Sequence, residues 1–148
     1  MLTYISLFSG AGGFSIGFNA LGYRCLFAND IDEDAEKTHN LNFPKTPFIR
    51  RDIAKLLPSE ILKATKGVKP DVIIGGPPCQ GFSMMGDKHG SDPRNQLFKH
   101  YVNLVRDLNP KCFVFENVKG LAQLHKGEFL KNLTKDFSAC GYDIYFKI

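Results

Sequence analysis

The stretch DVIIGGPPCQGFSMMG, residues 71–86, joins a short apolar run to two glycines, two prolines and a single cysteine. The unbroken run at residues 72–74 is typical of a central strand in a parallel sheet, where both faces are buried. The glycines permit a close backbone approach, and each proline fixes φ and removes a hydrogen-bond donor. Taken alone, Cys79 fits a buried structural role, but these neighbours favour a nucleophile on a stiffened loop.

Strand and helix patterns alternate along the rest of the chain. The expected strands are residues 3–8, 23–28, 48–53, 71–74 and 112–115, with a sixth beginning at 142. The expected helices are residues 14–21, 32–42, 56–65, 96–108 and 127–139. Because parallel neighbours need long right-handed crossovers, this order predicts an open, mainly parallel, doubly wound α/β sheet with helices on both faces. Ligands bind such sheets at the carboxyl edge.

The composition suits a single soluble domain. The chain has 148 residues, of which 43% are apolar and 23% charged. Neither a membrane span nor a signal peptide is recognisable, so a cytoplasmic location, in a bacterial cytoplasm or nucleoid, is expected. The four cysteines form no C-x-x-C pair, which predicts neither a metal site nor a disulfide, and Cys25, Cys112 and Cys140 are expected to be small core residues. A net charge of +4 favours a polyanionic partner without deciding the question.

Glycine and acidic residues fall where the expected strands end. The loop Gly10–Gly13 departs from a dinucleotide fingerprint, because Ser15 stands at its sixth position. Asp30 follows about twenty residues later, where a carboxylate binds ribose hydroxyls in related sheets, so the pair predicts an adenosine-containing ligand. Purely structural alternatives remain: Asp30 as a helix cap, Asp52 as a turn residue and Glu116 as a solvated charge.

Three segments, SLFSGAGGFSIGF, GGPPCQGFS and FENV, resemble in order and spacing the motifs of S-adenosylmethionine-dependent DNA cytosine-C5 methyltransferases. The resemblance covers essentially the whole chain and implies a Rossmann-like methyltransferase fold. It identifies residues 1–148 as the N-terminal portion of the catalytic domain. The family's target-recognition region and C-terminal motifs have no counterpart here. The sheet is therefore expected to be incomplete on its C-terminal side, in a fragment or in one subunit of a split enzyme.

The resemblance also implies the cofactor contacts. They are Phe8, Gly10, Ala11, Gly12, Gly13, Asp30, Ile31, Asp52, Ile53, Gly76, Pro78 and Leu97. In this assignment Phe8 packs against the adenine, Asp30 binds the ribose hydroxyls, and Asp52 with Ile53 meets the adenine. The glycine loop passes the methionine moiety, and Ile31 replaces a larger aromatic residue.

The chemistry of the family gives three residues catalytic roles. Carbon 5 of cytosine is too electron-poor to accept a methyl group directly, so the Cys79 thiolate is expected to add at carbon 6 first. Glu116 is expected to share a proton with ring nitrogen 3, and Asn117 to fix the neighbouring backbone and the target base.

A cytosine inside a duplex cannot reach such a pocket, so base flipping is implied. Residues 80–95 are expected to form a closing loop on double-stranded DNA, in which Gln80, Ser83 and Arg94 contact the DNA, the last two at phosphates.

Three alternatives stay open. The chain could be a catalytically silent module that binds cofactor or DNA. It could be a transfer-RNA cytosine-C5 methyltransferase, although Gly81 and Ser83 favour the DNA branch. A nicotinamide-dependent oxidoreductase is disfavoured by Ser15 and by the PPCQ loop.

Overall fold

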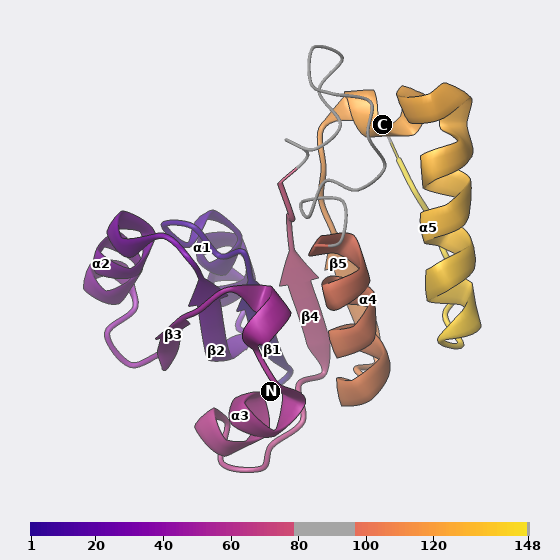
Figure 1. Ribbon diagram of the computed structural model, residues 1–148. Coiled ribbons are helices and arrows are strands. Elements are labelled where there is room, and N and C mark those ends of the chain that lie inside the picture. Colours follow the sequence, from indigo (N-terminus) through magenta and orange to yellow (C-terminus); the bar gives the residue numbers. More distant parts are fainter. Residues whose placement is uncertain (79–96, 148) are drawn as a thin grey trace.

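Five parallel strands form one open sheet in the order β3-β2-β1-β4-β5 (Figure 1). The structure, a computed structural model, describes residues 1–78 and 97–147. The strands are β1 (Thr3–Leu7), β2 (Arg24–Asp30), β3 (Phe48–Arg50), β4 (Val72–Gly75) and β5 (Cys112–Phe115). The helices are α1 (Gly13–Ala20), α2 (Glu33–Asn42), α3 (Pro58–Ala64), α4 (Leu97–Leu108) and α5 (Glu128–Ala139), with 3₁₀ segments η1 (Ile53–Lys55) and η4 (Lys119–Gly127).

Strand β1 is the centre of the sheet. It pairs in parallel with β2 on one side and with β4 on the other, and all five of its residues are buried. Tyr4 packs toward one face, while Ile5 and Leu7 pack toward the other. An apolar strand with both faces covered is what a doubly wound sheet requires, so the predicted fold class is confirmed.

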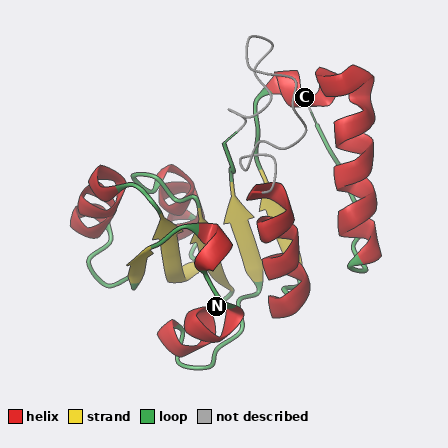
Figure 2. Cartoon of the chain, viewed as in Figure 1, coloured by secondary structure: helices red, strands yellow, loops and turns green. Residues whose placement is uncertain are grey.

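Helices lie on both faces of the sheet (Figure 2), and the apolar cores on the two faces differ in size. On one face, Phe14 and Phe18 of α1 pack against Tyr4, Val72 and Ile74. On the other face, α3, α4 and α5 contribute to a much larger cluster around the apolar side chains of β1, β2 and β4.

Tyr101 fixes α4 to the sheet. Its buried hydroxyl lies between the carbonyl oxygens of Val114 (3.0 Å) and Ile73 (3.3 Å) and shares its single hydrogen between them, and burial raises the pKa of this phenol. A buried phenol needs such partners, since an unpaired hydroxyl costs about 1–3 kcal/mol. The bonds join α4 to β4 and β5, and they hold Leu97, at the first turn of α4, near the carboxyl edge.

Two predicted strands differ from the structure. The strand expected at residues 48–53 ends at Arg50, because the Asp52 carboxylate accepts from the Ala54 N–H (2.9 Å) and turns the chain into η1. The strand expected from residue 142 is wrong for residues 142–147, which are irregular. There the Tyr142 hydroxyl donates to the Pro110 carbonyl (2.7 Å) and its ring packs on Phe113, so side-chain anchoring replaces strand pairing.

The cysteine prediction also needs correction. Cys112 is exposed, and Cys25 and Cys140 are only partly buried. Cys112 lies on β5, whose outer edge has no strand partner among the described residues. None of the helices in residues 1–78 and 97–147 has the length and apolar character to cross a membrane.

Candidate cofactor and catalytic site

A cavity of about 620 Å³ lies at the carboxyl edge of the strands. Eight of the twelve predicted cofactor residues line it: Phe8, Asp30, Ile31, Asp52, Ile53, Gly76, Pro78 and Leu97. They come from the ends of β1, β2 and β4, from η1 and from the start of α4. Residues spread over ninety positions of sequence therefore surround one hollow, at the edge where open α/β sheets bind ligands.

Phe8 enters the cavity from a strained backbone. Its φ is 53°, in the left-handed region, where a bulky side chain is an outlier. Gly10 follows in the same region with φ 51°. Such strain persists where the surrounding structure imposes it, and it clusters at binding sites. The conformation presents an aromatic ring at the carboxyl end of β1.

Asp30 is a hydrogen-bonding centre for two loops. One carboxylate oxygen, Oδ2, accepts from the Gly10 N–H (2.8 Å), and the other, Oδ1, accepts from the N–H groups of Ile31 (2.7 Å) and Asp32 (3.2 Å). The helix cap considered for Asp30 is made by Asp32 instead, which accepts from the Ala35 N–H (2.7 Å). Asp30 thus fixes the glycine loop to the end of β2 and also faces the cavity.

Asp52 is a turn residue that also lines the cavity. It caps the first turn of η1 through Ala54, as a turn residue does, and it also lines the cavity. The cap fixes the rotamer of the carboxylate, because one oxygen is tied to the backbone. Ile53 beside it is buried and forms part of the apolar wall.

The glycine loop sits behind Asp30, and its residues Gly10–Gly13 are not among those that line the cavity. Gly12 has φ 97°, and a Cβ there would overlap the ring of Phe43. His39 packs under the same loop and is fully buried; burial lowers the pKa of its imidazole. The rings of Phe43 and His39 therefore pack against the loop at Gly12 and fix its path.

Glu116 lies directly beside the strand end that leads to the cysteine loop. A Cβ at Gly76 would be 2.7 Å from Glu116 Oε2, so only glycine leaves room for this carboxylate. The Glu116 N–H donates to the Gly75 carbonyl (3.0 Å), and Asn117 Nδ2 donates to the Pro77 carbonyl (2.8 Å). These bonds join the end of β5 to the Gly-Pro segment after β4. Glu116 itself is exposed.

Four of the predicted site residues, Cys79, Gln80, Ser83 and Arg94, lie outside the described residues. The described chain stops at Pro78, next to the cavity, and resumes at Leu97, which also lines it. The predicted nucleophile therefore directly follows a residue of the cavity wall.

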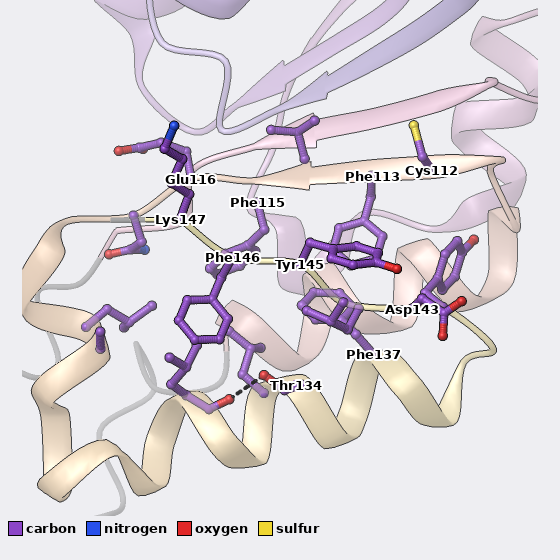
Figure 3. Close-up of a pocket in the computed structure, with 18 of the residues that line it drawn as sticks. Cys112, Phe113, Phe115, Glu116, Thr134, Phe137, Asp143, Tyr145, Phe146 and Lys147 are labelled. Carbon is purple, nitrogen blue, oxygen red and sulfur yellow. Dashed lines mark hydrogen bonds between the residues drawn. The ribbon is translucent and has the colours of Figure 1, made fainter.

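A second, larger hollow of about 1130 Å³ lies between β5, α5 and residues 142–147 (Figure 3). Phe113 and Phe115 point from β5 into it and meet Phe137 of α5, with Phe113 and Phe137 stacked at 4.2 Å between ring centroids. Tyr145 and Phe146 line it from the C-terminal segment. Glu116 is at the end of this hollow and does not line the smaller cavity.

Sequence reasoning missed four residues that line the smaller cavity: Asn29, Arg51, Ala54 and His100. Asn29 and Arg51 each adjoin a predicted aspartate, which is a signal that could have found them. His100 follows Leu97 by one helical turn, so it lies on the same face of α4.

Comparisons with known proteins identify the family of the chain. A family model for C-5 cytosine-specific DNA methylases matches residues 2–148. Type II methyltransferase M1.HphI of Haemophilus parahaemolyticus is 42% identical over 99% of this chain and 40% of its own length. Type II methyltransferase M.AquIA of Picosynechococcus is 46% identical over 90% of this chain and 55% of its own length.

Solved structures show the same fold. A protein described as a DNA modification methyltransferase encoded within an E. coli prophage superposes with a TM-score of 0.81 at 38% identity, over 94% of this chain and 38% of its own. A DNMT2 from Spodoptera frugiperda gives a TM-score of 0.69 at 27% identity, over 93% of this chain and 41% of its own.

The fold and the comparisons define an α/β protein of the methyltransferase type. The chain belongs to the C-5 cytosine-specific DNA methylase family. It spans between about a third and about half of the length of the curated relatives described above and of others like them.

Proposed function

We propose that this chain supplies the cofactor-binding and catalytic part of a DNA cytosine-C5 methyltransferase that uses S-adenosylmethionine. The observation that carries the proposal is the single cavity that gathers Phe8, Asp30, Asp52 and Pro78 from four separate segments. Family membership supports the same reaction class.

The cavity fits an adenosine-containing cofactor. Its volume of about 620 Å³ is within the range of about 300–1,000 Å³ typical of ligand pockets. Phe8, Ile53, Pro78 and Leu97 provide apolar surfaces suited to a purine. Asp30 retains acceptor capacity for ribose hydroxyls, and Asp52 can accept from the adenine amino group. When bound, S-adenosylmethionine supplies an activated methyl group.

The residues of the chain perform the remaining steps of the proposed reaction. The Cys79 thiolate adds to carbon 6 of the flipped cytosine, which makes carbon 5 nucleophilic. Glu116 shares a proton with ring nitrogen 3 as charge moves there. Asn117 holds the Pro77 carbonyl and so orients the segment before Cys79. After methylation, carbon 5 loses its proton and the sulfur is eliminated, which regenerates the thiolate.

The partners in this proposal are double-stranded DNA and further polypeptide. Gln80, Ser83 and Arg94 contact the DNA. The larger hollow beside β5 is mainly apolar and borders a strand edge that has no partner within residues 1–78 and 97–147, a surface suited to receive an added strand. Polypeptide of the kind that the relatives carry beyond the matched region, in the same chain or in a second one, completes the site.

A trapping experiment tests the function. The chain is mixed with the complementary C-terminal portion of a relative, S-adenosylmethionine, and a duplex that carries 5-fluorocytosine at the relative's target site. Fluorine blocks the loss of the carbon 5 substituent, so the enzyme stays covalently attached, and mass spectrometry detects the adduct. Cys79→Ser is expected to abolish the adduct.

Cys140→Ser is the matched control, because Cys140 is a partly buried cysteine at the end of α5 that lines neither hollow, and this variant keeps the adduct. A wild-type mixture that binds the cofactor but forms no adduct contradicts the enzymatic proposal and favours a silent module. An adduct with fluorocytosine-containing transfer RNA but not with DNA redirects the proposal to RNA. Tight binding of a nicotinamide dinucleotide in place of S-adenosylhomocysteine overturns the cofactor.

A further inference from the structure

The end of β2 holds together the loops that follow β1 and β3. The Asn29 carbonyl accepts from the Ser9 N–H (3.0 Å), the peptide group directly after Phe8. The side-chain nitrogen Nδ2 of Asn29 donates to the carbonyls of Ile49 (2.9 Å) and Arg51 (2.8 Å). The second of these carbonyls belongs to the peptide bond that begins Asp52.

Asn29 lies at the cavity and supports its wall, although it is not one of the predicted cofactor contacts. Its exposed fraction is 1%, and it lines the cavity. Its neighbour Asp30 completes the connection, because the Asp30 carbonyl accepts from the Arg51 N–H (2.9 Å) and the Asp30 carboxylate accepts from the Gly10 N–H. The residue pair thus sets where Phe8, Asp30 and Asp52 lie relative to one another.

The side-chain amide of Asn29 matches the two carbonyl oxygens that it faces. The two carbonyl oxygens of Ile49 and Arg51 need a group with two N–H donors on one nitrogen, which a side-chain amide provides. An aspartate of the same shape would direct a carboxylate oxygen at two carbonyl oxygens. An aliphatic side chain would remove both donors from these carbonyls, and buried polar groups without partners are costly.

We propose that Asn29 is a positioning residue that holds the Arg51–Asp52 peptide and thereby fixes the adenine-binding carboxylate at its distance from the ribose-binding carboxylate. This inference rests on the proposed function of the cavity. It assigns to Asn29 a role in how tightly, and how selectively, the adenine end of the cofactor is bound.

The experiment compares wild type, Asn29→Asp and the milder Asn29→Ser, by calorimetry with S-adenosylhomocysteine and with S-inosylhomocysteine. The inosine analogue replaces the amino group with a carbonyl, which an Asp52 held in place disfavours. Wild type is expected to prefer the adenosine ligand. Asn29→Asp is expected to lose about tenfold in affinity for it and to reduce the preference between the two ligands.

Thr65→Val is the matched control. Thr65 has an exposed fraction of 5%, and its hydroxyl donates to the backbone carbonyl of Val68 (2.7 Å), with the Leu62 carbonyl 3.3 Å away, at the opposite edge of the sheet. It is expected to lower the melting temperature while leaving the ligand preference unchanged. Hydrogen exchange adds a readout without ligand: the Ala54 amide, bonded to Asp52, exchanges faster in Asn29→Asp but not in Thr65→Val.

The outcomes separate two failures. If wild type binds neither ligand, the cofactor assignment falls and this inference falls with it. If wild type binds with the expected preference, and Asn29→Asp keeps both the preference and slow exchange at Ala54, only the positioning role of Asn29 is overturned. An affinity that falls only in step with melting temperature, as in a generally destabilised protein, overturns it as well.

Discussion

His39 is a buried titratable residue with an apolar environment. Its ring lies 4.8 Å from that of Phe43 and 5.1 Å from that of Phe48, between ring centroids. Neither ring nitrogen has a hydrogen-bond partner in the part of the chain that the structure describes. Burial disfavours the charged imidazolium and so lowers the pKa of His39 in the folded protein. The folded state therefore requires a neutral ring at this position.

This environment predicts a pH-dependent stability that His39→Leu removes. The unfolded ring binds a proton near its ordinary pKa of 6.5, whereas the folded ring does so only at lower pH. Stability is thus fully present above that pKa and falls as the pH drops from about 7 to about 5. The urea concentration at the unfolding midpoint should decrease as the pH falls through this range in wild type. In the variant, the part of this decrease that His39 causes should be absent.

At pH 7 the variant should be as stable as wild type or more so, because no hydrogen bond to the ring is lost. His100→Ala, a partly exposed histidine at the cavity, should keep the wild-type decline. Identical slopes in wild type and His39→Leu would show that another group titrates.

The sequence allowed a prediction of the acidic residues near the ends of the strands, but not of the residues that hold them in place. Asp30 stands out because its carboxylate follows the apolar run of β2, and Asp52 because it follows the short expected strand that begins at Phe48. Asn29 does not, since its importance comes from the register between β2 and β3, which places Nδ2 against two carbonyls twenty or more positions away. The role of His100 likewise depends on the rotation of α4 against the sheet.

At the scale of elements, one carboxylate joins the beginnings of three strands. Asp71, just before β4, accepts from the N–H (2.8 Å) and the hydroxyl (2.9 Å) of Thr3 in β1. Lys111, just before β5, lies with Nζ 2.7 Å from Asp71 Oδ1. The hydrogen bond from Lys111, followed by those from Thr3, lowers the pKa of Asp71 to about 2.

The expected consequence is a loss of stability at acidic pH that Asp71→Asn removes in part. The folded carboxyl has a pKa below its ordinary value of 3.8, so its contribution is complete above that value and is lost as the pH falls toward about 2. Thermal midpoints between about pH 5 and about pH 2 should fall less steeply in the variant than in wild type.

Asp136→Asn is a suitable control, because this exposed carboxylate of α5 takes part in no ion pair found among the described residues. Its thermal midpoints should fall with pH as steeply as those of wild type. If Asp136→Asn reduced the pH dependence as much as Asp71→Asn does, the assignment to Asp71 would be refuted.

The type of an element was predictable where its hydrophobic pattern is bounded by residues that end helices or strands. The apolar run at β4 and the helical spacing of α4 were interpreted correctly, because each is bounded by glycine, proline or asparagine. Residues 142–147 alternate as a strand would, yet a strand needs a neighbour, and Tyr142 is anchored to Pro110 instead. Local pattern carries no information about whether a pairing partner is available.

At the scale of the whole molecule, aromatic side chains are exposed on the side beyond β5. Tyr145 and Phe146 are 92% and 67% exposed, and they border the hollow that Phe113 and Phe115 line. An uncovered apolar surface beside an open strand edge favours association. The relatives carry additional length that this chain does not match.

We expect this surface to bind the complementary portion of a relative such as M1.HphI. Co-expression and light scattering should show a one-to-one complex. Phe146→Ser should weaken it by about tenfold or more, since a buried aromatic side chain contributes about 1.5–3 kcal/mol. Leu41→Ser, at an 83% exposed position on α2, is the control and should leave the complex intact. Equal weakening by both variants would place the contact elsewhere.

The left-handed backbone of Phe8 is a local strain that the packing of its own side chain offsets. Glycine adopts this conformation without the steric cost of a Cβ, which is about 1–2 kcal/mol for other residues. Exchanging the phenylalanine for glycine would relieve this strain, but it would also remove a ring that packs against the core and lines the cavity. Because truncating a buried phenylalanine costs about 3–5 kcal/mol, more than the strain that is relieved, the packing of the ring accounts for the persistence of an unfavourable backbone conformation.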